Sequence, residues 1–201
     1  MHMKTFPTLV SLLTLIILIT YIFYHEKSVI KKPERSAFSD NAVALTDSME
    51  MHYPSAAISF DIPEKISFAG EEVPLSLPDV RERLDKELQI NCYLHSNTIF
   101  LMKRASRWLP QMEAILKRYN IPEDFKYLPL IESNLLNVSS PRGATGYWQI
   151  LKESGKEFGL EITAEVDERY DPLKSTEAAC KYLVRAHRKF GNWTLAAASY
   201  N

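Results

Sequence analysis

The spacing of apolar residues after position 79 restricts the fold of this chain more than any other feature. From there to the end, apolar side chains return every three or four positions, which is the period of one face of an α-helix. Asp79 and Glu82 fit a capping box at the start of the first helix. No later stretch has the alternation typical of a β-strand, so the expected fold class is mainly α. The residues expected to face inward from the first helix are Val80, Leu84 and Leu88.

Prolines divide the middle of this region into further helices. Leu101, Ala105, Trp108 and Leu109 form one run, and Pro110 is expected to open the next helix, because proline suits the first turn of a helix and disrupts its interior. Pro122 is expected to open a helix that ends near Glu132, with a bend at Pro129. The sequence therefore predicts a helix boundary at each of the first two prolines.

Two more helices are expected toward the end of the chain. Asp171 and Pro172 start a long helix that Gly191 ends, and residues 193–200 begin another. The chain stops inside this last pattern, so we expect a domain that is truncated at its C-terminus. The expected inward residues of the long helix are Ala179, Tyr182, Leu183, Ala186 and Phe190.

The part before residue 78 differs in character. Residues 6–24 carry no charged side chain, and 19 residues of helix at about 1.5 Å each extend about 28 Å, close to the hydrocarbon thickness of a bilayer. An uncleaved transmembrane anchor is expected, with a cleaved signal peptide as the alternative. Residues 25–77 contain four prolines and no sustained helical period, so they are expected to form a linker whose end packs on the domain at 78–201.

One polar stretch interrupts the helical pattern, from Glu132 to Gln149. The glutamate closes an apolar run, Tyr127-Leu128-Pro129-Leu130-Ile131, and glycines punctuate the turn that follows. An acid in an apolar frame can stay protonated near neutral pH, as a general acid must. Glycines let the backbone approach a ligand closely, and Trp and Gln are common sugar-contacting side chains. The stretch predicts one acid in a sugar-binding cleft.

This stretch resembles the lytic transglycosylase (SLT) domain of the lysozyme-like superfamily, in particular its membrane-bound murein transglycosylase D branch. The shared motifs are Glu132-Ser133, then Ser140 before Gly143-Ala144-Thr145-Gly146, then Trp148-Gln149, and later Ala198-Ser199-Tyr200-Asn201. The likeness runs from about Asp79 to the end and implies a lysozyme-like fold.

The resemblance also implies roles for individual residues. Glu132 is expected to be the catalytic acid. Packing in the core is the alternative role for Tyr147 and Trp148. No cofactor or metal is implied, and the five histidines show no metal-ligand spacing. The residues expected to bind substrate are Ser140, Gly146, Tyr147, Gln149, Tyr200 and Asn201.

The reaction implied by the resemblance needs only one acid. Glycosidases commonly use two carboxylates, yet no acid after Glu132 stands in a comparable apolar frame. Glu132 is expected to protonate the β-1,4 bond between N-acetylmuramic acid and N-acetylglucosamine of peptidoglycan. It then deprotonates the muramoyl 6-hydroxyl, which forms a 1,6-anhydromuramoyl end. The alternatives are a goose-type lysozyme-like hydrolase that uses water, and a non-catalytic peptidoglycan-binding fragment.

The expected location follows from this substrate. Residues 6–24 would hold the protein in the inner (cytoplasmic) membrane, with residues 1–5 in the cytoplasm and the domain in the periplasm or cell-wall space. The cations that follow the apolar run favour the opposite orientation, and this conflict stays open. The expected partners are peptidoglycan glycan strands, and a net charge of −1 without a dense basic patch argues against nucleic acid. Cys92 and Cys180 are expected to be free thiols, with a disulfide as the alternative.

Overall fold

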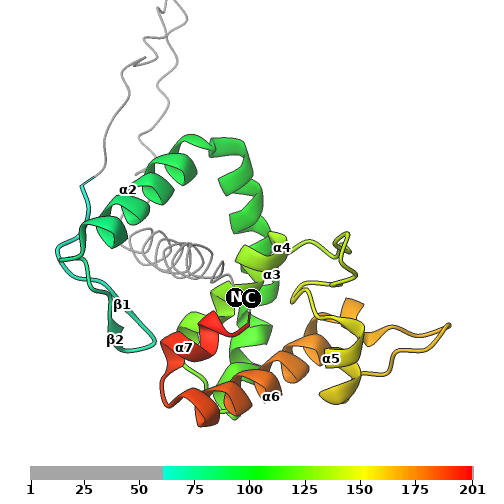
Figure 1. The fold of residues 1–201 in the computed structure, drawn as a ribbon. Coiled ribbons are helices and arrows are strands. Elements are labelled where there is room, and N and C mark those ends of the chain that lie inside the picture. Colours follow the sequence, from blue (N-terminus) through cyan, green and yellow to red (C-terminus); the bar gives the residue numbers. More distant parts are fainter. Residues whose placement is uncertain (1–60, 201) are drawn as a thin grey trace, which may run out of the picture.

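The structure, a computed structural model, describes residues 61–200 (Figure 1). The predicted anchor, most of the predicted linker and Asn201 lie outside these residues. Within residues 61–200, no helix is both long enough and apolar enough to cross a membrane. The described part of the chain is mainly helical, as predicted.

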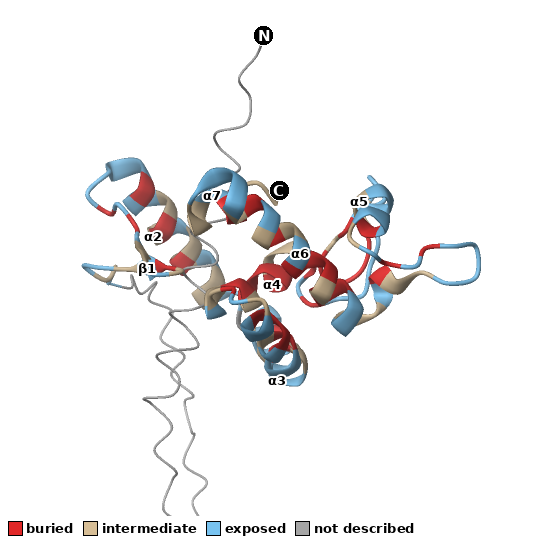
Figure 2. Ribbon diagram, turned by 90° about the horizontal axis from the view of Figure 1, so that it is seen from below, coloured by how far each residue is buried: buried red, intermediate tan, exposed pale blue. Residues whose placement is uncertain are grey.

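Two long helices organise this part. Helix α3 (His95–Arg118) packs against α6 (Pro172–Phe190), and α6 also packs against α7 (Trp193–Ala198) (Figure 1). Figure 2 shows buried residues on these helices, whereas the connecting loops contain both exposed and buried stretches. The other elements are β1 (Ser67–Phe68), β2 (Glu71–Glu72), α2 (Pro78–Tyr93), α4 (Leu128–Ser133), α5 (Lys152–Glu157) and the 3-10 helices η1 (Glu123–Tyr127) and η2 (Glu168–Tyr170).

Helix α2 begins at Pro78, two residues earlier than a capping box at Asp79 predicts. Leu77 is its N-cap and makes no side-chain capping hydrogen bond, so the predicted capping box is wrong. Pro78 occupies the first turn, where its missing N–H costs nothing, and Asp79 lies inside that turn rather than at the cap. The predicted inward face is confirmed, because Val80, Leu84 and Leu88 are all buried.

Pro110 does not divide α3, so the predicted boundary is wrong. The helix runs without interruption from His95 to Arg118. Pro110 is exposed, so the Ser106 carbonyl that loses its helical partner can be solvated by water. Apolar burial on both sides of the proline favours the continuous helix over the break. The buried residues of α3 are Leu101, Ala105, Leu109, Met112, Ile115 and Leu116.

Helix α6 has the predicted ends. The Asp171 side chain accepts hydrogen bonds from the N–H groups of Leu173 and Lys174, and Gly191 ends the helix with φ 82°. Phe190 was predicted to face inward, but it is 39% exposed. Residues 188–191 are all exposed, so the last turn of α6 extends beyond the elements that cover the rest of the helix.

The end of the predicted linker packs on the helices, as expected. Strands β1 and β2 form a short antiparallel hairpin, and the buried Phe68 ring lies 5.3 Å from the Phe125 ring. The Glu71 carboxylate accepts hydrogen bonds from the N–H groups of Trp193 (2.7 Å) and Thr194 (3.1 Å). The hairpin therefore caps the N-terminus of α7 from far away in the sequence.

Candidate active site

Glu132 lies in the last turn of α4, and two short elements place it there. The single helix predicted from Pro122 is instead the 3-10 helix η1 followed by α4, so that prediction is wrong. Pro129 explains the division, because it sits in the first turn of α4, where its lack of an N–H is tolerated. Asn134 then ends α4 with φ 53°. The chain turns away directly after the acid.

The Glu132 side chain is half-buried, and one of its carboxyl oxygens has no hydrogen-bond partner. Its Oε1 atom is the only buried side-chain N or O atom in residues 61–200 that makes no hydrogen bond. Burial disfavours the charged form and raises the pKa of Glu132 from 4.5 to about 7. At neutral pH a large share of the molecules therefore carries a protonated Glu132, which is the state that a general acid needs.

Glu132 borders a cavity of about 450 Å³. The cavity lies between the loop after α4, helices α5 and α6, and Tyr200. Glu132 is the only carboxylate among the residues that line it. The other lining residues are Ser140, Arg142, Ala144, Gln149, Ile150, Leu151, Ser154, Phe158, Ala178, Ala179, Tyr182 and Tyr200.

The acids that follow Glu132 serve other purposes. Asp167 pairs with Arg169, and Glu168 pairs with Lys174. Glu157 pairs with Arg185. Glu153, Glu161 and Glu165 are exposed and do not line the cavity, and Asp171 caps α6. The expectation of a single framed acid therefore agrees with the arrangement of residues 61–200.

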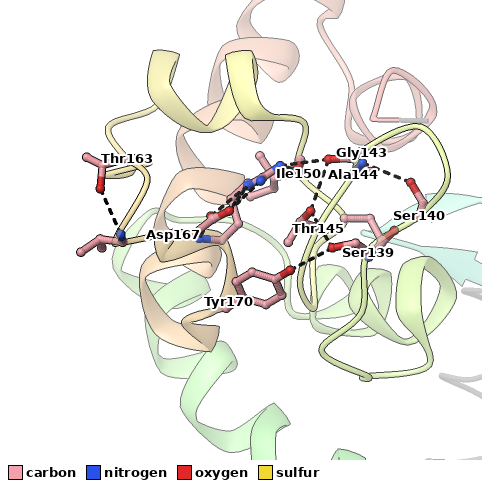
Figure 3. Close-up of polar contacts among 12 residues, drawn as sticks. Ser139, Ser140, Gly143, Ala144, Thr145, Ile150, Thr163, Asp167 and Tyr170 are labelled. Carbon is pink, nitrogen blue, oxygen red and sulfur yellow. Dashed lines mark hydrogen bonds and ion pairs between the residues drawn. The ribbon is translucent and has the colours of Figure 1, made fainter.

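The loop between Glu132 and Gln149 is held by polar contacts (Figure 3). The N–H of Ser140 donates to the Ala144 carbonyl (2.8 Å), and the N–H of Ala144 donates to Ser140 Oγ (3.1 Å). Ser139 Oγ contacts both the Thr145 hydroxyl and the Tyr170 hydroxyl at 3.0 Å. Because Ser140 Oγ accepts a bond inside the loop, its own proton is free to be donated to a ligand in the cavity.

Arg169 anchors this loop from η2, and the sequence analysis missed it. Its side chain is buried, is paired with Asp167 at 2.6 Å, and donates from Nη1 to the carbonyl oxygens of Gly143 (2.9 Å) and Ile150 (3.2 Å). The one signal in the sequence is an arginine two residues after an aspartate, which is too common to stand out. The role of Arg169 depends on contacts with residues that lie 19 and 26 positions away in the sequence.

Gln149 lines the cavity with its amide oriented by the loop. Its Nε2 donates to the carbonyl oxygens of Val138 (2.9 Å) and Gly146 (2.8 Å). Both partners are acceptors, so the nitrogen must take this side of the amide and the side-chain oxygen takes the other. Gln149 can therefore offer Oε1 to a ligand hydroxyl or amide group.

Gly146 and Tyr147 were expected to bind substrate, but neither lines the cavity. A Cβ atom on Gly146 would lie 1.9 Å from the Arg169 carbonyl oxygen, so this glycine permits close packing of the loop on η2. The Tyr147 ring is buried and lies 5.4 Å from Trp108, and its carbonyl accepts a hydrogen bond from Ser133 Oγ (2.8 Å). Core packing, the alternative role for Tyr147, matches this environment.

Trp148 is also a core residue. It is fully buried, and its indole N–H donates to the Thr176 hydroxyl (2.7 Å). The Tyr200 hydroxyl, expected to bind substrate, donates to the Trp148 carbonyl oxygen (2.8 Å). Tyr200 does line the cavity beside Glu132. Burial, and then the charge of Glu132, raise the pKa of Tyr200 well above its usual value.

The inner side of the cavity contains residues that sequence reasoning did not assign to the site. Phe158 and Tyr182 line it with ring centroids 5.7 Å apart, and Tyr182 packs edge-on against Tyr200 at 5.3 Å. The Tyr182 hydroxyl donates to the Ser199 carbonyl. The helical spacing of Tyr182 indicated burial, but not a cavity. Asn201 lies outside the described residues, and both cysteines are free, as predicted.

Comparisons with known proteins agree with this arrangement. Residues 110–201 match the Transglycosylase SLT domain. Over 140 residues, the chain is 33% identical to the membrane-bound lytic murein transglycosylase D of two Escherichia coli strains. The matched residues make up 67% of this chain and 30% of those proteins. It is also 32% identical over 111 residues to a putative tributyltin chloride resistance protein of an Alteromonas species, covering 54% of each.

The chain thus spans about a third to a half of the length of these relatives. The matched residues include the acid, the polar loop and Tyr200, which together border the cavity. Through residues 110–201, this chain belongs to the transglycosylase SLT family.

Proposed function

We propose that this protein is a lytic transglycosylase that cleaves the β-1,4 bond between N-acetylmuramic acid and N-acetylglucosamine in peptidoglycan. The observation that carries the proposal is one half-buried acid, with an unpaired buried Oε1 atom and a pKa of about 7, in a cavity lined by no second carboxylate. The names of the Escherichia coli relatives describe the same class of activity.

In the proposed reaction Glu132 acts first as acid and then as base. Its proton goes to the oxygen of the scissile bond, which leaves as the 4-hydroxyl of N-acetylglucosamine while the bond to muramoyl C1 breaks. The Glu132 carboxylate then accepts the proton of the muramoyl 6-hydroxyl, whose oxygen forms a new bond to C1. The acid is restored, no water is consumed, and a 1,6-anhydromuramoyl end results.

A single acid is sufficient because the nucleophile belongs to the substrate. An intramolecular attack can reach an effective concentration of about 10⁵ M or more when its geometry is right. The Ser140 hydroxyl and the Gln149 amide oxygen are positioned to hold the sugar, because the rest of each side chain is fixed by the loop. The burial of Glu132 supplies the proton at neutral pH.

A hydrolase is the second candidate. It would use the same acid with a bound water, and it would release a reducing end instead of an anhydro end. The cavity is lined by one carboxylate, so no second group of this kind is placed to activate that water. This favours the transglycosylase.

The products distinguish the two. Purified peptidoglycan is digested with the protein, and the released muropeptides are measured by mass spectrometry. Anhydro products are lighter by one water than hydrolysis products, which also respond to reduction with borohydride. Products made only of the reducible kind would replace the proposal with the hydrolase.

We also propose that residues 6–24 anchor the protein in the inner (cytoplasmic) membrane, with the helical domain outside the cytoplasm. The support is the run of 19 uncharged residues and a peptidoglycan substrate that lies outside that membrane. Reporter fusions after residue 25 test the orientation. Reporter activity confined to the cytoplasm would contradict it.

A further inference from the structure

Arg142 is the one cation among the residues that line the cavity, and its side chain has no partner in residues 61–200. The remaining lining residues are neutral, apart from the acid itself. Four other arginines of the described part, Arg104, Arg118, Arg169 and Arg185, bind a carbonyl or a carboxylate, and no arginine except Arg142 lines the cavity. An exposed guanidinium at a cavity is therefore left available for a ligand.

The backbone of Arg142 is fixed even though its side chain is exposed. Pro141 and Arg142 are the central residues of a turn that closes when the Gly143 N–H donates to the Ser140 carbonyl (2.9 Å). The next peptide is held by Arg169 Nη1, which donates to the Gly143 carbonyl (2.9 Å). The turn thus presents the guanidinium from a defined point at the edge of the cavity.

The cation and the acid occupy separate parts of the cavity. A guanidinium beside Glu132 would lower the pKa of that carboxyl group, but burial alone accounts for its raised pKa. Arg142 is exposed, whereas Glu132 Oε1 is buried. The acid is therefore at the inner side, and the free positive charge is at the mouth.

Resting on the proposed function, we infer that Arg142 binds a carboxylate of the muramoyl residue's side group at the mouth of the cavity. A guanidinium matches a carboxylate through two parallel N–H···O bonds, and it stays charged at all relevant pH values. N-acetylglucosamine has no carboxylate, whereas the muramoyl side group ends in a lactyl carboxylate or in an attached peptide that carries carboxylates. Arg142 would then select strands by what the muramoyl sugar carries.

The test compares three glycans in the full chain with Glu132→Gln, which prevents turnover. One is chitohexaose, which has no carboxylate. The second is a peptide-free murein oligosaccharide with free lactyl groups, and the third is the same oligosaccharide with its peptides attached. Arg142→Gln is expected to leave the Kd for chitohexaose unchanged and to raise it for one or both charged glycans about three- to tenfold.

The pattern across the glycans identifies the source of the carboxylate. If Arg142→Gln weakens binding of the peptide-free oligosaccharide, the partner is the lactyl carboxylate. If it weakens binding only of the oligosaccharide with attached peptides, the partner is a carboxylate of the peptide. The loss should shrink as salt is added, and Arg142→Lys should restore part of it. Arg188→Gln is the matched control, because it removes the same charge from an exposed position on α6 that does not line the cavity.

Two results would overturn the inference. One is an equal loss of affinity for all three glycans, and the other is no loss of affinity for any of them. Both results count only if the protein binds the glycans and, with Glu132 intact, cleaves peptidoglycan. If the protein with Arg142 intact neither binds these glycans nor cleaves peptidoglycan, the proposed function fails, and this inference fails with it.

Discussion

The helical framework and the loop from residue 134 to 149 are stabilised by different interactions. In α3 and α6, apolar side chains such as Leu116 and Leu183 are fully buried. In the loop, hydrogen bonds from Ser133, Arg169 and Tyr200 hold backbone carbonyl groups in place. The loop also concentrates residues with positive φ, namely Asn134, Leu135, Gly143, Gly146 and Gln149. Apolar burial secures the fold, whereas the polar contacts define the shape of the cavity.

Glu132→Gln should show the largest difference between the two regions, with cleavage lost and the helical framework kept. The amide cannot donate the required proton, so cleavage of peptidoglycan should fall at least about 100-fold, the lower end of what general acid–base catalysis supplies. The fold should be kept, because the amide is close in size to the acid. Release of soluble muropeptides measures cleavage, and circular dichroism measures the fold.

The matched control is Glu153→Gln, an exposed acid that does not line the cavity. Its cleavage rate should stay within about twofold of the unmodified protein, since it lacks a role in proton transfer. If Glu132→Gln retained more than a hundredth of the activity, or if Glu153→Gln lost as much, Glu132 would not be the acid.

Leu116→Ala should instead destabilise the helical framework. Leu116 is fully buried in α3, so the smaller side chain should leave a cavity and lower the free energy of unfolding by about 2 to 5 kcal/mol. Cleavage at a temperature where the variant is folded should be little changed. Urea unfolding gives the stability. A large loss of activity in the folded variant would show that the framework also sets the geometry of the site.

Glu132 should make the stability of the protein depend on pH. Its pKa is 4.5 in the unfolded chain and about 7 in the folded one, so the unfolded state releases this proton first as pH rises. The resulting cost is absent below about pH 4.5, grows up to pH 7 and reaches about 3 kcal/mol above it. Glu132→Gln removes this cost.

The difference in unfolding free energy between Glu132→Gln and the unmodified protein should therefore grow in favour of the variant from pH 4 to pH 8. Urea unfolding at several pH values measures it. Parallel stability curves over this range would mean that the carboxyl group is not held in the buried state described above.

Arg169→Met tests whether the polar anchor of the loop is needed. The change leaves Asp167 without its partner and removes the donor to two loop carbonyl groups, so stability should fall by about 2 kcal/mol. Cleavage should fall further than this loss of stability explains, because the loop lines the cavity. Thermal melting and muropeptide release measure both.

Arg118→Met is the matched control. Its partner is Glu177, and both side chains of this pair are well exposed, at 62% and 43%. A pair of this kind is worth about 0 to 1 kcal/mol, so the change should have little effect on stability or cleavage. Equal effects of the two changes would remove the distinction between the buried anchor and a surface pair.

Tyr200→Phe should have the smallest effect on stability. It removes the donor to the Trp148 carbonyl and keeps the ring contacts with Trp148 and Tyr182, so about 1 kcal/mol should be lost. A fall in cleavage beyond that would indicate that the hydroxyl turns to Glu132 or to the sugar when substrate binds. Unchanged melting would contradict the hydrogen bond seen here.

The framework could be predicted from the sequence because its signals are local. The period of apolar residues placed Val80, Leu84 and Leu88 inside, and Asp171 and Gly191 marked the ends of α6. The prediction at Pro110 was wrong because burial of neighbouring side chains in α3 outweighs the local cost of a proline inside a helix. Local preferences alone do not decide a helix boundary when both sides are anchored in a core.

The site was predicted only in part. The resemblance led to Glu132, Ser140, Gln149 and Tyr200, all of which line the cavity. It did not reveal Arg169, since an arginine that holds carbonyl groups 19 and 26 residues away leaves no periodic trace. Nor could it separate residues that support the cavity from those that face it.

The capping of α7 by Glu71 has a consequence for how this domain can change in evolution. The two groups are separated by 122 residues, and Glu71 lies well before residue 110, where the family match begins. The part of the chain that packs together is therefore longer than residues 110–201 alone. A lineage that replaced residues 67–72 would have to supply a new carboxylate for α7 and a new aromatic ring in the place of Phe68. Residues 67–72 are thus subject to the domain's own selection, unlike a tether that makes no contact with it.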